Sequence, residues 1–269
     1  MSKDYIAKTG AAAKSRLTLQ HEVFLPGTDE LLKLTEFHPD MQVLVIGCGC
    51  GDETLHIAKK LSALGHITGI DISAEQINQA KQAAELAKIS HKIHFIISDI
   101  MNLNNNYKNK FDLILGRFVI PHFTDPRQAI LKLKECLKTN GTLASQEPIV
   151  SKAWSEPPSP ALTKYLSLMT AWAKTMNLDF DMATTIPNLF RDCGLLMVQE
   201  QRWQPKVTSA EQKATVALSA EECAEAIISK NLITKDEMAQ LIQSIQKEVV
   251  DSDAILYQCE NVLTVGRRD

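Results

Sequence analysis

Between residues 40 and 150, short runs of apolar residues alternate with longer segments whose apolar residues recur at helical spacing. The short runs predict strands, and the longer segments predict amphipathic helices. The predicted strands are residues 42–47, 66–71, 92–98, 111–116 and 142–147. The predicted helices are residues 52–64, 72–89 and 125–141, the last closed by a glycine. Strands that alternate with helices predict parallel pairing in a doubly wound α/β sheet that has helices on both faces.

After Glu147 the pattern changes to a turn-rich segment followed by helical segments and two further strands. The turn-rich and helical segments are residues 151–160, 161–178, 184–195 and 209–250. The further strands are predicted at 195–203 and 254–268, which makes a mostly parallel sheet of seven strands. The helices inserted near these last strands are predicted to form a lid. The N-terminal segment, the core, and the lid with the last two strands then span residues 1–40, 41–150 and 151–269.

Composition and charge narrow the class of protein. The chain has 269 residues, of which 45% are hydrophobic, and its net charge is −3 with a pI near 6.2. This charge argues against a nucleic-acid partner and against an anionic membrane surface. The six cysteines form no CxxC pair and match no zinc template, so we expect reduced thiols, no metal and a cytoplasmic location. The N-terminus lacks the apolar region of a signal peptide, and no apolar run is long enough to span a membrane.

The stretch VLVIGCGCGDE, residues 43–53, is a predicted strand that runs into glycines at every second position. Such glycines let a ligand approach the backbone, although they also occur in plain tight turns. A dinucleotide-binding turn requires GxGxxG, and Asp52 stands where its third glycine belongs. The turn also carries no Lys or Arg to pair with a pyrophosphate. The pattern therefore disfavours an NAD-dependent oxidoreductase and favours a ligand without phosphates.

Two acids follow the next two predicted strands. Asp71 ends the second strand and Asp99 follows the third. In an open α/β sheet, ligands bind outside the carboxyl ends of the strands. A carboxylate at the first place can accept the hydroxyls of a ribose, and one at the second can accept an adenine amino group. Each acid also has a local explanation, as a helix N-terminal acid or a loop residue. Together with the glycine turn they predict an adenosine ligand.

At these residues the chain resembles the class I S-adenosylmethionine-dependent methyltransferases. The matching segments are VLVIGCGCG, GIDIS, SDI, FDLILGRFVIPHFTDP and LKECLKTNGTLASQEP. The resemblance covers residues 40–150 and implies a Rossmann-like fold. It also implies S-adenosylmethionine as cofactor and S-adenosylhomocysteine as product. The stretch SRLTLQHEVF, residues 15–24, is similar to an N-terminal helix of some of these proteins, so we expect residues 1–40 to fold as a helical segment over the crevice.

The resemblance implies which residues of the glycine turn and of the second strand contact the cofactor. The backbone of Gly47, Cys48 and Gly49 would lie against the amino-acid part of the cofactor. Asp71 would hold the ribose, and Ile72 would pack on one face of the adenine. The glycines in this interpretation replace side chains that would otherwise separate the ligand from the backbone.

The resemblance also implies cofactor contacts after the third and fourth strands. Asp99 would bind the adenine amine, with the backbone of Ile100 beside it. Gly116 and Arg117 would lie near the sulfonium and the carboxylate of the methionine part. For Arg117 a surface ion pair is an equally open interpretation.

Four residues are candidates for contact with the methyl acceptor. His122 follows the fourth strand, where a general base could deprotonate a hydroxyl, although it could also be a packing histidine. Gln20 and His21 lie on the predicted N-terminal helix. Trp172 lies in an apolar helix, where a core position competes with a substrate wall.

The acceptor is predicted to be a small, apolar or aromatic molecule that is methylated in line, at a hydroxyl. GRFVIPHF replaces the [DNS]PP[YFW] motif of enzymes that methylate base amines, and no acid cluster follows the fourth strand for metal-assisted catechol methylation. The alternatives are a regulatory protein that binds the cofactor without catalysis, an enzyme that uses a modified cofactor, and the oxidoreductase already disfavoured. Homodimer formation stays open.

Overall fold

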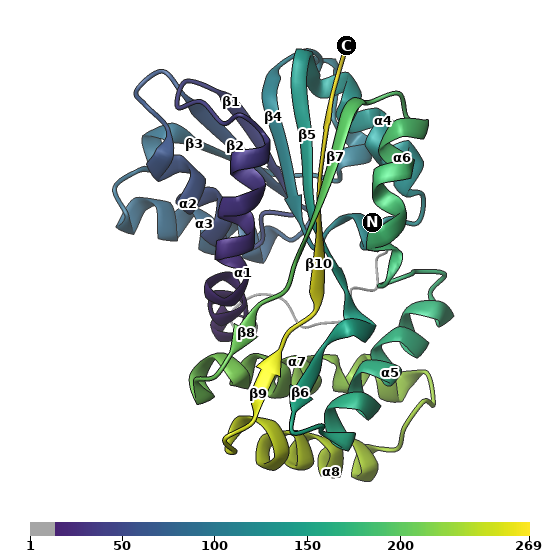
Figure 1. Ribbon diagram of the computed structural model, residues 1–269. Coiled ribbons are helices and arrows are strands. Elements are labelled where there is room, and N and C mark those ends of the chain that lie inside the picture. The colour runs from purple at the N-terminus through teal and green to yellow at the C-terminus, as the bar shows by residue number, and fades with distance from the viewer. Residues whose placement is uncertain (1–13) are drawn as a thin grey trace.

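The structure of the protein is a computed structural model that describes residues 14–269, and its centre is a seven-stranded sheet (Figure 1). The strand order is β3-β2-β1-β4-β5-β10-β7. The strands are β1 (Gln42–Ile46), β2 (His66–Asp71), β3 (Ile93–Ile97), β4 (Phe111–Arg117), β5 (Leu137–Ile149), β7 (Leu196–Trp203) and β10 (Glu260–Arg267). β1 to β5 pair in parallel, whereas β10 is antiparallel to both of its neighbours. The predicted fold class, a mostly parallel α/β sheet of seven strands, is confirmed.

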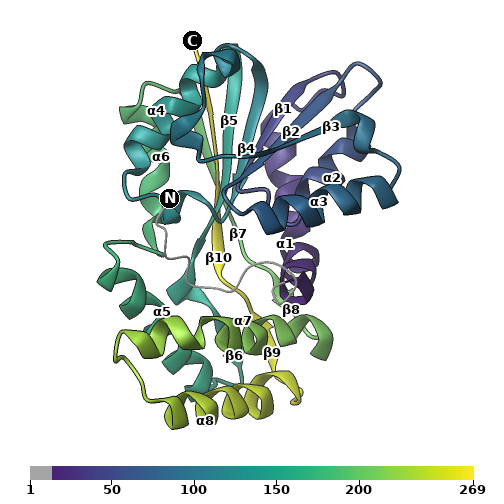
Figure 2. The same ribbon diagram turned by 180° about the vertical axis from the view of Figure 1, so that it is seen from behind.

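Helices cover both faces of the sheet, and the residues of β1 show why (Figures 1 and 2). Side chains of a strand alternate between faces, so a strand that is apolar throughout must be covered on both sides. Val43 and Val45 pack into one apolar cluster, and Leu44 and Ile46 pack into another. The first cluster contains residues of α1 (Lys14–Leu34), α2 (Asp52–Lys60) and α3 (Ala74–Leu86), and the second contains residues of α4 (Pro126–Cys136) and α6 (Ile186–Asp192).

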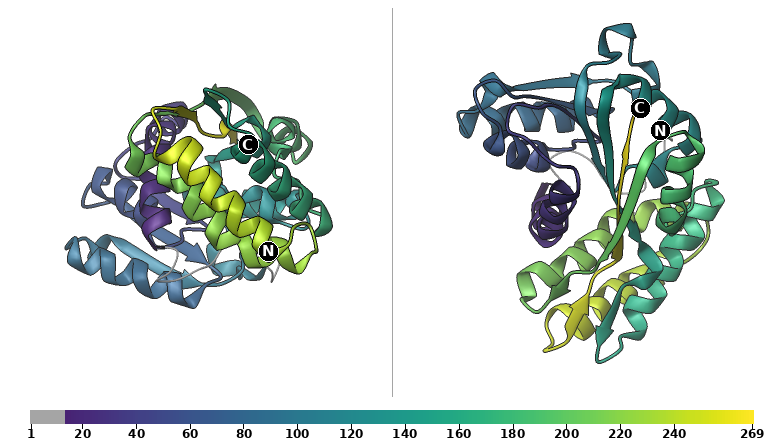
Figure 3. Two further views of the ribbon diagram at one scale, coloured as in Figure 1. Left: turned by 90° about the horizontal axis from the view of Figure 1, so that it is seen from below. Right: turned by 45° about the horizontal axis from the view of Figure 1, so that its top comes forward.

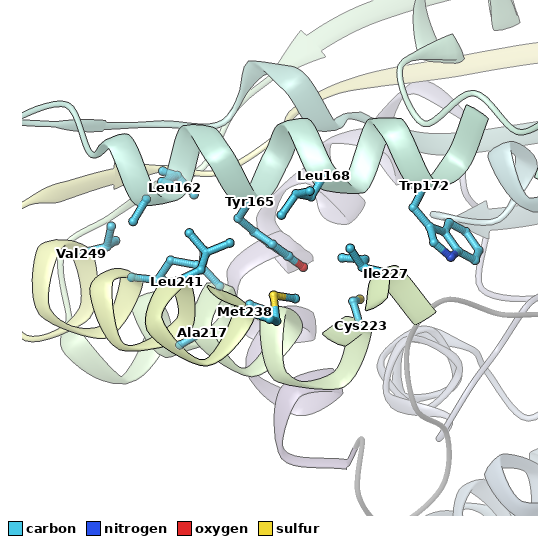
Figure 4. Packing of buried hydrophobic residues seen from close by; sticks show 14 of the residues in the cluster. Leu162, Tyr165, Leu168, Trp172, Ala217, Cys223, Ile227, Met238, Leu241 and Val249 are labelled. Atoms are coloured by element: carbon cyan, nitrogen blue, oxygen red, sulfur yellow. The ribbon is translucent and has the colours of Figure 1, made fainter. Parts of the chain in front are cut away.

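The lid lies beyond the carboxyl ends of the parallel strands (Figures 1 and 3). Its helices are α5 (Pro160–Thr175), α7 (Ala210–Ser229) and α8 (Lys235–Ile245). Each begins at a hydroxyl N-cap, which satisfies a free backbone N–H of the first turn: Ser159, Ser209 and Thr234. The three helices enclose an apolar core of their own (Figure 4). A three-stranded sheet adjoins them, in the order β6 (Trp154–Glu156), β9 (Ile255–Tyr257), β8 (Lys206–Val207).

Several predicted boundaries are wrong. The helix predicted to end at Gly141 ends at Cys136, because Leu137 already pairs with Phe111 and begins β5. The helix predicted over 52–64 ends at Lys60, where the next residue is extended. The final predicted strand is two strands, and Gln258 between them donates its N–H to the carbonyl of Pro205.

Other differences concern segments whose structure was not predicted or is not described. The turn-rich segment 151–160 contains the short strand β6, which pairs with β9. The predicted N-terminal helix is present as α1 over residues 14–34. The prediction covered residues 1–40; residues 35–40 form turns rather than helix, and residues 1–13 lie outside the described residues.

Candidate active site

The turn after β1 presents bare backbone at the carboxyl edge of the sheet. Gly47 and Gly49 have positive φ angles of 59° and 53°, a conformation that favours glycine. A Cβ on Gly47 would lie 2.5 Å from Cγ2 of Val119, whereas a Cβ on Gly49 would meet no heavy atom within 4 Å. The Cys48 side chain is buried in the core, and its N–H donates to the carbonyl of Ile70. The turn is therefore held by the sheet on one side and open on the other.

Asp71 is fixed at the end of β2 by the turn beside it. Its carboxylate accepts the N–H of Gly49 at 3.0 Å and the N–H of Ser73 at 2.9 Å, one on each oxygen. Burial raises the pKa of this carboxyl, and the backbone N–H groups oppose the rise. The N–H of Ile72 is a third backbone donor to this carboxylate, which still has acceptor capacity for a ribose hydroxyl. Next to it, Ile72 is 40% exposed, an apolar surface that a flat ring could cover.

Asp99 follows the neighbouring strand. Asp71 pairs with Ile97 in the parallel ladder, so the two acids follow adjacent strand ends as predicted. The carboxylate of Asp99 accepts the N–H of Met101 at 3.0 Å and begins a short 3₁₀ turn that includes the buried Ile100. Met101 is 43% exposed and was not predicted as a site residue. A lone methionine among polar loop residues gave no sequence signal for this position.

Arg117 at the end of β4 joins α1 and α2 to the crevice. Its guanidinium nitrogens lie 3.2 Å from Oγ1 of Thr28, 3.2 Å from Nδ1 of His21 and 3.9 Å from Oε1 of Glu53. Burial, followed by the charge of Arg117, lowers the pKa of His21 to about 4, so this histidine is neutral. Gly116, just before, allows close packing, because a Cβ there would lie 2.8 Å from Cγ1 of Ile46.

A cavity of about 160 Å³ lies between the sheet edge and the lid. Most of its wall is apolar: Phe24, Phe118, Pro121, Pro148, Val150, Ala153, Leu162, Leu166, Met169, Phe180 and Val216. Its polar lining residues, with two cysteines, are Arg16, Gln20, His122, Tyr165, Thr215, Ser219, Cys223, Gln258 and Cys259. Two of the four predicted acceptor-contact residues, Gln20 and His122, thus line this cavity.

Comparison with known proteins agrees with this arrangement of crevice and cavity. Residues 37–250 match the family described as methyltransferase domain. The chain belongs to this methyltransferase family. A demethylmenaquinone methyltransferase of Lactiplantibacillus plantarum is 29% identical over 118 residues, which cover 42% of this chain and 49% of that protein. A 2-phytyl-1,4-naphtoquinone methyltransferase of Trichormus variabilis is 26% identical over 125 residues, which cover 46% of this chain and 53% of that protein. This methyltransferase-family chain thus spans about half the length of these relatives.

Solved structures share the fold of this methyltransferase-family chain at low sequence identity. The YcgJ protein from Bacillus subtilis superposes with a TM-score of 0.59 and 17% identity over 89% of this chain and 97% of that one. The predicted resemblance to class I S-adenosylmethionine-dependent methyltransferases is confirmed at the level of family and fold. This membership favours a methyltransferase over the NAD-dependent oxidoreductase.

The other two candidate residues do not line the cavity of this methyltransferase-family chain. Trp172 is 2% exposed and stacks at 6.2 Å on Phe180, whose ring is part of the cavity wall, so Trp172 supports the wall from behind. His21 contacts Arg117 and packs edge-on against the ring of His56 at 6.1 Å. It belongs to the polar network of the crevice.

His122 sits on a short 3₁₀ helix, Ile120–His122, that projects into the cavity wall. Its ring meets that of Phe180 edge-on at 5.3 Å. Burial lowers its pKa to about 4, so the imidazole is neutral at physiological pH and can accept a proton. The buried Glu147 holds this helix, because its carboxyl accepts the N–H groups of Val119 at 3.0 Å and of Ile120 at 3.1 Å.

Two buried acids near the site were not predicted. Burial raises the pKa of Glu147 to about 8, against the opposing effect of its backbone donors. Glu222 on α7 pairs with Arg16 on α1, Oε2 to Nε, at 2.7 Å, and both side chains are 8% exposed. A glutamate on a predicted helix is ordinarily a surface residue, so sequence offered no signal for Glu222. Arg16 also donates to Oε1 of Gln20 at 2.7 Å.

The described residues contain neither a metal-binding cluster nor a helix that could span a membrane. Within residues 14–269, no three His, Cys, Asp or Glu side chains gather closely enough to hold a metal ion. None of the helices over the same residues has the length and apolar character needed to cross a bilayer. All six cysteines are free thiols.

Proposed function

We propose that this protein is an S-adenosylmethionine-dependent methyltransferase whose acceptor is a small, mostly apolar ring compound with a phenolic hydroxyl. The observation that carries the proposal is a single loop that serves both sites. Gly116 and Arg117 border the crevice, and the residues that follow directly, Phe118, Pro121 and His122, line the cavity. A molecule in the cavity is therefore adjacent to a ligand in the crevice.

The residues of the crevice fit the cofactor. Asp71 has acceptor capacity for a ribose hydroxyl, Gly49 faces open space, and Ile72 and Met101 offer apolar surface for an adenine. The glycine turn, residues 47–51, carries no Lys or Arg for a phosphate, and the one cation at the border of the crevice named above, Arg117, contacts Thr28, His21 and Glu53. When bound, S-adenosylmethionine supplies a methyl carbon on a sulfonium sulfur that departs with the bonding electron pair as the neutral thioether of S-adenosylhomocysteine. The protein contributes position and exclusion of water.

The chemistry of the cavity wall favours a ring compound as acceptor. Aromatic and aliphatic side chains dominate the wall, and such walls bind apolar ligands through buried area, with few polar groups for orientation. Two relatives that are named as methyltransferases of a demethylmenaquinone and of a naphthoquinone support this choice. We therefore place a quinone-like or phenolic ring, rather than a charged metabolite, in the cavity.

The proton balance favours a phenolic hydroxyl over an aliphatic one. In the proposed order of steps, the acceptor oxygen first gives its proton to His122, and the resulting oxyanion then attacks the methyl carbon. From a phenol with a pKa near 10 to a histidine with a pKa of about 4, the transfer is uphill by about 8 kcal/mol. From an alcohol near the pKa of water the cost is about 16 kcal/mol, which alone equals the whole barrier of a reaction at about 10 s⁻¹. His122 can therefore serve only an acidified hydroxyl.

Two measurements test the proposal in sequence. In calorimetric titration, S-adenosylmethionine and S-adenosylhomocysteine are expected to bind at micromolar concentrations and NAD is not. With a radiolabelled methyl group on the cofactor, label is then expected on 1-naphthol and other phenols, and none on cyclohexanol. Binding of NAD alone would overturn the cofactor assignment, and transfer to cyclohexanol at a similar rate would overturn the phenolic acceptor.

A further inference from the structure

Three polar side chains form a cluster in the lid wall of the cavity: Tyr165 on α5, and Ser219 and Cys223 on α7. The hydroxyl of Tyr165 lies 2.7 Å from Oγ of Ser219 and also hydrogen-bonds with the thiol of Cys223. Figure 4 shows Tyr165 reaching from α5 towards α7, with its oxygen on the side of Cys223. The proposed methyl transfer uses none of the three groups, although all of them face the space assigned to the acceptor.

Two of the three contacts within the cluster involve sulfur. Each of the three groups carries one hydrogen, and Tyr165 and Ser219 contact each other and both contact the thiol of Cys223. Burial raises the pKa of Tyr165 well above its usual value and that of Cys223 to about 11, so neither group loses its hydrogen near neutral pH. Sulfur is a weak acceptor, so an oxygen that entered the cavity would compete well for the tyrosine hydrogen.

The neighbouring polar residues of the wall are committed to one another. The amide of Gln258 donates to Oγ1 of Thr215 at 2.7 Å, and Thr215 donates to a carbonyl of its own helix at 2.8 Å. Arg16 donates to Glu222 and to Gln20. The hydroxyl cluster differs from these pairs because two of its contacts involve sulfur, so it can form a new hydrogen bond to a ligand by giving up a weak one.

We propose that the hydroxyl pair of Tyr165 and Ser219 donates a hydrogen bond to an oxygen of the acceptor and selects oxygenated rings over hydrocarbons of the same shape. The inference rests on the proposed function for the identity of the cavity. His122 belongs to a different element, the 3₁₀ helix after β4, so an acceptor with two oxygens can be held at one and deprotonated at the other. The pair acts in recognition, while the chemistry stays with His122.

Equilibrium dialysis of two probes tests the pair without any methyl transfer. The probes are 1-tetralone, whose carbonyl can only accept a hydrogen bond, and tetralin, the same ring system without the oxygen. Each is dialysed against the full chain with and without saturating S-adenosylhomocysteine. The wild-type protein is expected to bind 1-tetralone about tenfold more tightly than tetralin, the effect of one hydrogen bond to a buried donor.

The variants decide which residues cause this discrimination. Tyr165→Phe and Ser219→Ala are each expected to reduce the ratio to below about threefold through weaker 1-tetralone binding, with tetralin binding unchanged. Tyr257→Phe is the matched control, since Tyr257 lies in the small sheet, stacked on Trp154, and does not line the cavity. It is expected to keep the full ratio.

Two results would overturn the inference. The first is a wild-type protein that does not discriminate between the probes, including one that binds neither. The second is a Tyr165→Phe variant that retains the wild-type ratio, as the Tyr257→Phe control does. Because dialysis needs no turnover, these results are independent of the proposed activity. Discrimination by a protein that transfers no methyl group would reject the activity and leave the recognition pair in place.

Discussion

The crevice and the cavity are neighbours that are built in different ways. The crevice consists of backbone N–H groups and carboxylates at the ends of adjacent parallel strands, and the sheet register fixes their positions. The cavity consists of side chains from α1, the 3₁₀ helix after β4, α5 and α7, with further residues beside β5 and β9. Movement of one helix would reshape the cavity, whereas the crevice would change only if the sheet itself changed.

Because of this difference, amino-acid substitutions should change the crevice little and the cavity strongly. A ligand that is the same in every turnover can be bound by backbone, which substitution alters little. An acceptor that differs between proteins of one fold must be selected by side chains, which substitution alters directly. Variants at the two sites should therefore affect different measurements, and four predictions test that separation.

The largest effect is expected from His122→Ala, which tests whether the cavity carries the chemistry. Loss of a general base typically lowers the rate by 10²–10⁴-fold. We expect kcat to fall by that amount on 1-naphthol, while the Kd of S-adenosylhomocysteine in calorimetry stays within twofold. Unchanged turnover would remove His122 from the mechanism, and weakened cofactor binding would show that the two sites are not separable at this residue.

Next in size is Arg16→Met, which tests whether α1 belongs to both sites. The substitution removes the Arg16 guanidinium from the buried carboxylate of Glu222, and breaking a buried ion pair typically costs about 3–5 kcal/mol, or roughly 6–20 °C in Tm. The double variant Arg16→Met/Glu222→Leu removes both charges and is expected to recover most of the loss. Thermal unfolding of the two proteins side by side measures the difference; equal Tm values for both would contradict it.

Glu147→Gln tests the support beneath the loop that joins the sites. The pKa of the Glu147 carboxyl is about 8 in the folded protein, against an ordinary value of 4.5. Between these two pH values the carboxyl is protonated in the folded protein and ionised in the unfolded chain. Wild-type stability from this group is therefore fully present below pH 4.5 and is lost as pH rises to about 8. Gln cannot ionise, so the variant gains on the wild type by up to about 4–5 kcal/mol across that range.

The measurement for Glu147→Gln is the free energy of unfolding by denaturant at pH 5 and at pH 9. The gain should be large at pH 9 and below about 1 kcal/mol at pH 5, where the folded wild type also carries a neutral side chain and only its unfolded chain is ionised. A constant difference at both pH values would show that Glu147 stays ionised and that its backbone donors outweigh the effect of burial.

The smallest effect of the four is expected from Asp71→Ala, which isolates the crevice. It removes charge-assisted hydrogen bonds of about 1.5–3 kcal/mol each, so cofactor binding should weaken at least tenfold. Binding of 1-tetralone without cofactor should not change, because Asp71 does not line the cavity. Asp112→Ala, at a surface ion pair with Lys138 far along β4, serves as the control that removes a carboxylate elsewhere.

The crevice could be predicted from sequence because its parts are tied to strand ends. A buried strand that runs into glycines and acids that follow the next two strands are local patterns, and parallel pairing brings them together without further information. The same reasoning predicted the position of His122, since it follows the fourth strand closely. For these residues the order along the chain is also the order across the sheet.

The cavity could not be predicted because its residues meet only after the lid folds. Tyr165 and Ser219 are 54 positions apart and lie on helices whose packing angle no local pattern specifies. Trp172 was a reasonable candidate by composition, yet it lies behind Phe180, because one helix turns some apolar residues to the cavity and others to the lid core. The end of α4 was missed for a similar reason, since pairing with β4 overrode the helical pattern after Cys136.

The path of the chain between sheet and lid limits how an acceptor can reach the cavity. The chain enters the lid along β5, returns to the sheet through residues 176–185, enters the lid again along β7 and returns along β10. The strands β5, β10 and β7 are neighbours in the sheet and are joined by hydrogen bonds. A hinged lid is joined to its domain by short flexible segments. This lid is joined to the sheet by three strands that are hydrogen-bonded to one another. The helix α1 is fastened to α7 chiefly through side chains, including Arg16. The lid is therefore fixed to the sheet through the backbone of paired strands, whereas α1 is fixed to the lid through side chains.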